Sequence, residues 1–227
     1  YFSAKTDSTG AELWNYDGAN TTLVADMYPG PINSSPGDFV AFNDKLHFYA
    51  STPTYGNELV IYDPLAGTIT YKDIYPGSGS SYPRGLTLMN GKLYFRGNDN
   101  MNTGGELWSF DGTTYQQVSD IRPGASHSSD PEGFTVFEDK LYFQANDGIF
   151  GAELWSYDPV ADTSVLVADI DPSNSLFGSD PRQFTVFNNR LFFNADDDVN
   201  GEELWSYDGV SVHCLLYTSD AADDRSC

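Results

Sequence analysis

The chain has 227 residues, including 4 Trp, 15 Tyr and 15 Phe, which is ample aromatic material for a sizeable core. Its 33 acidic residues against 11 Lys and Arg give a formal net charge of −22, which repels nucleic-acid backbones and anionic membrane surfaces. No apolar run approaches the roughly 18 residues that a membrane span needs. We therefore expect no nucleic-acid partner and no membrane insertion.

In chain order, the predicted elements follow a repeated word. It reads GAELWNYD from Gly10, GNELVIYD from Gly56, GGELWSFD from Gly104, GAELWSYD from Gly151 and GEELWSYD from Gly201. Successive copies of its fifth residue, Trp14, Val60, Trp108, Trp155 and Trp205, lie 46, 48, 47 and 50 residues apart. A repeat of this length is typical of β-propeller blades.

Each period contains four strand-like runs, shown by FTVF, LYFQA, ELWSYD and VLVADI between Phe134 and Ile170. Their β-branched and aromatic residues favour strands, and no helical periodicity appears. The first two runs are joined by pairs that suit type I′ hairpins: Asn43-Asp44, Asn90-Gly91, Glu138-Asp139 and Asn188-Asn189. The third and fourth are joined by turns that an aspartate can cap: Asp17, Asp63, Asp111, Asp158 and Asp208.

The two remaining connections of each period are longer, polar and rich in Gly or Pro, as in DIRPGASHSSDPEG from Asp120. Strand direction reverses at every connection of an antiparallel meander, so both long loops emerge at one edge of the sheet. Loops on a rigid scaffold commonly carry binding. We predict that ligands bind at this long-loop edge.

The fold predicted is an all-β, β-propeller-like array of four-stranded antiparallel blades of about 47 residues, present as an incomplete fragment. The expected blades are 38–84, 85–132 and 133–182, with partial blades at 1–37 and 183–213. A closed ring would need about 280 to 400 residues, so we expect a longer native protein. Residues 214–227 resemble a translated sequencing adapter and are expected to be a non-native tail, or else a disordered C-terminus.

The segment ELWSFDGT, from Glu106 to Thr113, resembles the bacterial ELWxxDGT repeat family, and the similarity extends over nearly all of residues 1–213. Only this copy keeps the full DGT, and the copy at Gly56 lacks the tryptophan. The resemblance implies a large secreted or surface-attached bacterial protein with kelch-like propeller repeats. It supplies no catalytic residues.

The repeated tryptophan has two interpretations. Side chains alternate along a strand, so Glu153, Trp155 and Tyr157 share one face while Leu154 and Asp158 lie on the other. Trp14, Trp108, Trp155 and Trp205 are expected to pack between adjacent blades, where Val60 would be a smaller filler. Stacking on a sugar at the surface is the alternative.

A second recurrence is acidic. Glutamates begin the third strand, Glu12, Glu58, Glu106 and Glu153, and aspartates end the fourth, Asp26, Asp73, Asp120 and Asp169. We expect each carboxylate to accept hydrogen bonds from loop N–H groups and so to anchor its loop. In the alternative, some of these pairs bind Ca²⁺ together with loop acids, for which Asp196, Asp197 and Asp198 are the candidates. No other cofactor is predicted.

No nucleophile elbow, metal-binding histidine pair or P-loop is present in the sequence. Arg84 and Arg182 occupy equivalent loop positions and are candidates to contact an anionic ligand, although solvated arginines are common in loops. The leading prediction is a non-catalytic extracellular or cell-surface module that binds a protein or polysaccharide. The alternative is a carbohydrate-active propeller hydrolase or lyase with its catalytic acids in missing blades or in loops.

Overall fold

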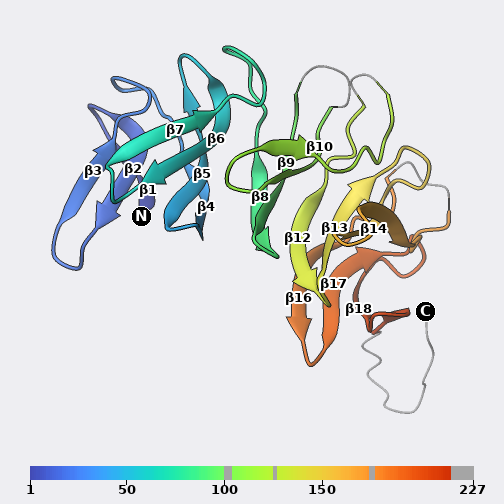
Figure 1. Ribbon diagram of the computed structural model, residues 1–227. Helices are drawn as coiled ribbons and strands as arrows, with labels where there is room; N and C mark the ends of the chain where they lie inside the picture. The colour runs from blue at the N-terminus through green and yellow to red at the C-terminus, as the bar shows by residue number, and fades with distance from the viewer. Residues whose placement is uncertain (100–103, 125–126, 174–176, 216–227) are drawn as a thin grey trace. The chain divides into compact units, whose positions relative to one another are not determined.

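The computed structural model describes residues 1–99, 104–124, 127–173 and 177–215, and every regular element within these ranges is a β-strand (Figure 1). The all-β fold predicted from the sequence is therefore confirmed. No helix in these ranges is long and apolar enough to cross a membrane. The chain divides into two compact units, Tyr1–Gln117 and Val118–Cys227, which we describe separately.

The first unit contains three antiparallel sheets whose strands are ordered as in the chain. The first sheet has three strands, β1 (Phe2–Thr6), β2 (Gly10–Tyr16) and β3 (Thr21–Ala25). The second has β4 (Gly37–Phe42), β5 (Lys45–Thr52), β6 (Gly56–Asp63) and β7 (Thr68–Lys72). The third has β8 (Arg84–Met89), β9 (Lys92–Gly97), β10 (Glu106–Phe110) and β11 (Tyr115–Gln117).

The second unit contains two four-stranded meanders. One has β12 (Glu132–Phe137), β13 (Lys140–Asn146), β14 (Ala152–Asp158) and β15 (Thr163–Ala168). The other has β16 (Arg182–Phe187), β17 (Arg190–Asp196), β18 (Glu202–Tyr207) and β19 (Val212–Cys214). The segment 183–213, expected as a partial blade, thus forms all four strands, because β19 pairs with β18. Cys214, which we placed in the tail, is its last residue, and residues 216–227 of that tail lie outside the described ranges.

The hairpin turns follow from the residues that the sequence places in them. Both central residues of each first-to-second-strand turn have positive φ, for example 51° at Asn43 and 59° at Asp44. Type I′ turns require this conformation, which matches the twist of the flanking strands. The predicted two-residue hairpins are confirmed, and the turn at Asn43 sets the pairing of Phe42 with Lys45.

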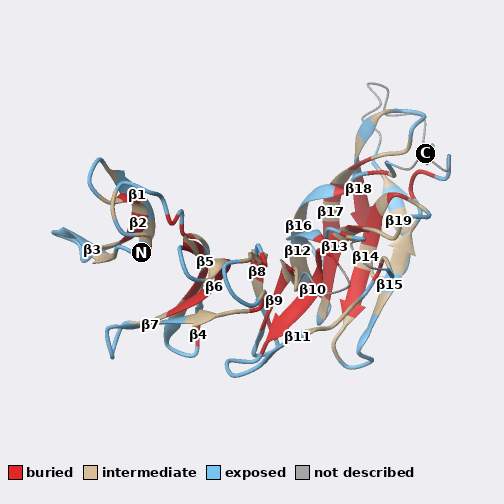
Figure 2. Cartoon of the chain, turned by 90° about the horizontal axis from the view of Figure 1, so that it is seen from above, coloured by how far each residue is buried: buried red, intermediate tan, exposed pale blue. Residues whose placement is uncertain are grey.

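The core lies between consecutive sheets within each unit, and buried residues concentrate on the middle strands (Figure 2). In the first unit, one cluster joins Leu59 and Ile61 of β6 to Trp108 and Phe110 of β10. First strands lie side by side, β4 beside β8 and β12 beside β16. Consecutive sheets therefore share an apolar interface and adjoin along their first strands.

The leucine of the repeated word shows how this packing is repeated. Leu13, Leu59, Leu107 and Leu154 are fully buried, whereas Leu204 is 44% exposed. Leu154 belongs to a cluster with Phe193 of β17 and Trp205 of β18, in the sheet that follows its own. No later sheet in the described residues covers Leu204, so the same residue type is buried or exposed according to its neighbour.

Candidate functional site

A glutamate with no exposed surface lies near the start of the strand that carries the repeated word in each of the first four sheets: Glu12, Glu58, Glu106 and Glu153. This strand is β2 in the three-stranded first sheet and the third strand in the others. Glu58 accepts hydrogen bonds from the Ile74 N–H (3.1 Å), the Tyr75 N–H (3.4 Å), the Ser81 N–H (2.8 Å) and the Ser81 hydroxyl (2.5 Å). Its carboxylate thus holds both ends of the loop between β7 and β8. This is the arrangement that a buried charged group requires.

Glu12 and Glu153 make the same set of contacts. Glu12 accepts from the N–H of Met27 and from the N–H and hydroxyl of Ser34, at 2.6–3.0 Å. Glu153 accepts from the N–H of Ile170 and from the N–H and hydroxyl of Ser179, at 2.6–2.9 Å. In each case the donors lie at the beginning and the end of the loop that leads to the next sheet.

The serine extends the link into the following sheet, because its carbonyl accepts a further backbone hydrogen bond. The Ser81 carbonyl accepts from the N–H of Asn98, just after β9, at 2.9 Å. Equivalent bonds run from Ser51 to Ser34, from Asn146 to Ser129 and from Asp196 to Ser179, at 2.8–2.9 Å. We call this arrangement the glutamate–serine clamp. It joins the third strand of one sheet, the connecting loop and the second strand of the next sheet.

Burial changes the acidity of the clamp glutamates. It raises the pKa of Glu58 to about 7, and the hydrogen bonds from Ser81, Ile74 and Tyr75 act in the opposite direction. Burial also raises the pKa of Glu153, opposed by the hydrogen bonds from Ser179 and Ile170. Desolvation is the larger effect at both residues, because no cation among the described residues pairs with either carboxylate.

The clamp serines were missed in the sequence, although a signal for them exists. The serines Ser34, Ser81 and Ser179 each precede a residue with positive φ and then a proline, in SSPGDF, SYPRGL and SDPRQF, and Ser129 in SDPEGF follows the same sequence pattern. The glycine before the glutamate belongs to the same arrangement. Gly56 has φ 65°, and a Cβ there would lie 1.7 Å from the Gly79 carbonyl oxygen. Only glycine allows the loop to approach the strand this closely.

The predicted partner aspartates do not form hydrogen-bonded pairs with the glutamates. The carboxylates of Asp26 and Asp73 instead accept from the N–H groups of Gly30 (3.4 Å) and Gly77 (3.2 Å). Asp120 is exposed. Asp169 lies close enough to raise the pKa of Glu153 by charge repulsion, and burial, Asp171 and Asp147 raise the pKa of Asp169 itself.

The turn aspartates act within their own turns. Each accepts from the backbone N–H groups two and three residues later, at 2.7–3.1 Å, in the series Asp17, Asp63, Asp111, Asp158 and Asp208. These N–H donors stabilise the charged form and lower the pKa of all five groups, that of Asp208 to about 2. The repeated aspartate is therefore occupied by local hydrogen bonds.

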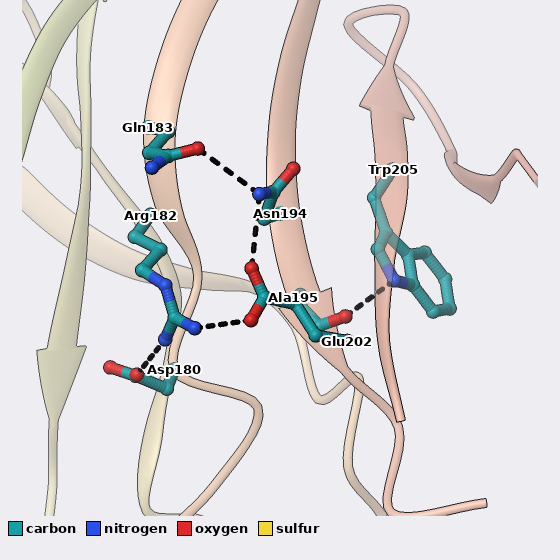
Figure 3. Close-up of polar contacts among 7 residues, drawn as sticks. All are labelled: Asp180, Arg182, Gln183, Asn194, Ala195, Glu202 and Trp205. Atoms are coloured by element: carbon teal, nitrogen blue, oxygen red, sulfur yellow. Dashed lines mark hydrogen bonds and ion pairs between the residues drawn. The ribbon is translucent and has the colours of Figure 1, made fainter. Parts of the chain in front are cut away.

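The tryptophans of the repeated word differ in burial. Trp108 and Trp205 are buried between sheets, while Trp14 and Trp155 are partly exposed. Val60 is fully buried in a cluster with Leu13 and Met27 of the preceding sheet and loop. The Trp205 indole N–H donates to the Ala195 carbonyl at 3.1 Å (Figure 3).

The acidic loop 196–198 directs its oxygens toward its own chain. Asp197 Oδ1 accepts from the N–H groups of Val199 (3.0 Å) and Asn200 (2.7 Å), and Asp196 Oδ1 accepts from the N–H of Asp198 (2.8 Å). Among the described residues, no three His, Cys, Asp or Glu side chains lie together as a metal site would require. The carboxylates of this loop thus act as backbone acceptors.

The two arginines at equivalent positions have different surroundings. Arg182 forms ion pairs with Asp180 and Glu202, and Glu202 also accepts a hydrogen bond from Asn194 at 3.0 Å (Figure 3). Arg84 stacks on the Tyr49 ring with its Cζ 3.7 Å from the ring centroid. Two carboxylates therefore neutralise Arg182, whereas Arg84 is held by an aromatic ring.

No family model and no curated protein sequence matches the chain. Solved structures similar to it include a puromycin hydrolase S511A mutant complexed with PGG, at 12% identity and a TM-score of 0.60, over 90% of this chain and 31% of that chain. A prolyl endopeptidase matches at 10% identity and 0.60, over 95% and 34%. TolB from Acinetobacter baumannii matches at 14% identity and 0.52, over 92% and 50%. The chain thus spans about a third to a half of these β-propeller proteins, and the likeness concerns the fold alone.

Proposed function

We propose that the chain is a non-catalytic binding module of the β-propeller type, part of a larger ring, that binds a protein or polysaccharide at its long-loop edge outside a bacterial cell. The glutamate–serine clamp carries the proposal. The recurrent buried acids, which would be the first candidates for catalysis, use their oxygens to fix the loops that follow their strands. The recurrent residues thus form a scaffold, and the variable loop residues remain for recognition.

The sequence supports an extracellular location through its resemblance to secreted and surface-attached repeat proteins and its acidic composition. Candidate acids such as Asp197 are engaged by backbone N–H groups. These observations favour binding over the alternative of a carbohydrate hydrolase or lyase.

A glycan and protein array, paired with an assay for newly formed reducing ends, tests this function on the full chain. We expect binding without turnover. The matched variants are Ile32→Ser, on the loop between β3 and β4, and Leu65→Ser, in the turn at the opposite edge, since both side chains are exposed, at 51% and 97%. Binding lost only in the first variant places the ligand at the long-loop edge. Release of reducing ends would instead support the carbohydrate-active enzyme.

A further inference from the structure

Two arginines lie opposite each other at the long-loop edge of the third sheet. Arg84 of β8 is paired in register with Arg96 of β9, so their side chains leave the same face of the sheet. Only 11 of the 227 residues are Lys or Arg. Like charges in directly opposed positions destabilise an antiparallel pair. This register places a second cation opposite Arg84.

The guanidinium of Arg84 is oriented by neutral partners. It lies over the Tyr49 ring, and its Nη1 donates to the Asn57 side-chain oxygen (3.2 Å) and to the Pro83 carbonyl (2.7 Å). Asn57 itself is buried, with 6% of its surface exposed. These two acceptors use both hydrogens of Nη1. Among the described residues, Nε and Nη2 have no acceptor, and their parallel N–H bonds form the fork that matches a carboxylate.

The repeat position alone does not produce this open fork. At the equivalent position, Arg182 is neutralised by Asp180 and Glu202. Asp38, which contacts the residue after Arg84, uses Oδ2 to accept the Gly85 N–H at 2.7 Å. The open fork of Arg84 is thus specific to this sheet.

An exposed aromatic residue lies two positions before Arg84. Tyr82 is 56% exposed and has a φ of 48°, a conformation that bulky residues rarely adopt. The same position holds Ser35, Asp130 and Asp180 elsewhere in the chain. Its N–H donates to the Asn57 carbonyl at 3.2 Å, so it is tied to the residue that also holds Arg84. The equivalent residues Ser35, Asp130 and Asp180 have φ of 47–49°, so the repeat sets this conformation and only this sheet places an aromatic ring there.

We infer that Tyr82 and Arg84 form a subsite for an acidic sugar residue, with Arg84 binding the sugar carboxylate and Tyr82 offering an aromatic face to the ring. This inference rests on the proposed binding function and specifies its ligand. The net charge of −22 opposes densely charged polyanions. A uronate, with one carboxylate per ring, reduces that repulsion and fits a single fork.

Isothermal titration calorimetry of the full chain with tri-galacturonate tests the subsite. We expect Arg84→Lys, which keeps the charge but removes the fork, to weaken binding tenfold or more. Arg182→Lys at the equivalent position should change it less than twofold. The trimer's methyl ester should bind the unmodified chain at least tenfold more weakly than the acid. Tyr82→Ser should weaken the trimer but leave binding of acetate unchanged, and circular dichroism checks the fold of each variant.

Equal affinity for acid and ester, or for the unmodified chain and Arg84→Lys, overturns the inference. The inference is also overturned if inorganic phosphate, or a peptide through its free C-terminal carboxylate, binds more tightly than tri-galacturonate. A neutral glycan or protein bound on the array while tri-galacturonate is not bound overturns the subsite but leaves the binding module standing. If no glycan or protein on the array binds the chain, the result counts against the binding module itself.

Discussion

Ser81→Ala tests the glutamate–serine clamp most directly. The change removes the hydroxyl that donates to Glu58 at 2.5 Å and leaves the three backbone donors in place. At pH 8, Glu58 is mostly ionised, because its pKa is about 7. A hydrogen bond to a charged group is worth about 1.5–3 kcal/mol, so the loop should open roughly tenfold to more than a hundredfold more often.

The cost should shrink at low pH. Burial raises the pKa of Glu58 above its ordinary 4.5, so protonation favours the folded state, and the contribution of Glu58 to stability falls as pH rises from about 4.5 to about 7. At pH 5 the group is mostly neutral, and losing a neutral hydrogen bond costs only about 0.5–1.5 kcal/mol. The expected difference between unmodified chain and variant is therefore larger at pH 8 than at pH 5.

Hydrogen–deuterium exchange of peptides that span 73–83, corrected for intrinsic rates at each pH, measures this opening without requiring a cooperative melt. Ser109→Ala is the matched control, since Ser109 is 2% exposed and its hydroxyl has no hydrogen-bond partner among the described residues. It should leave the loop protected as before. Unchanged protection in Ser81→Ala at pH 8, or an equal loss of protection at both pH values, would refute the clamp's role.

Three further predictions use repeat positions as internal controls. Leu154→Ala, at a fully buried site, should cost about 2–5 kcal/mol in urea unfolding, whereas Leu204→Ala, 44% exposed, should cost clearly less; equal costs would contradict the inter-sheet packing. Val60→Trp restores the repeated tryptophan at a fully buried site and should destabilise by about 1–3 kcal/mol through overpacking, seen as a lower urea midpoint. The pKa of Asp208, lowered to about 2, means that its stabilising contribution is present above pH 3.8 and is lost as pH falls toward 2; a ¹³C carboxyl titration with an ordinary midpoint would disprove the turn contacts.

Much of the fold could be predicted because its signals are local. The meander follows from strand-forming runs separated by turn residues, and pairs such as Asn43-Asp44 adopt the left-handed conformation that the hairpin needs. The short last strand, Val212–Cys214, was not recognised, because three residues carry too little pattern and depend on pairing with β18. Distant contacts decided that element.

The candidate site was only partly predictable. Sequence recurrence identified Glu58 and its counterparts, but the printed sequence separates them from their donors by 15 to 26 residues, and the serines among those donors were not recognised as a motif. Asp169 raises the pKa of Glu153 by charge repulsion, after the larger effect of burial, and no hydrogen bond joins the two carboxylates. Which loop groups reach a carboxylate depends on how the loop returns to the next sheet.

The sequence by itself determined the repeat, the order of strands and the edge at which the long loops emerge, because these depend on residue type and spacing over a few positions. Only the tertiary structure distinguished Arg84 from Arg182. Both follow a serine, a residue with positive φ and a proline, yet one stacks on Tyr49 and the other pairs with Asp180 and Glu202. A guanidinium's partners are set by the side chains that neighbouring strands bring to it, and local spacing does not contain that information.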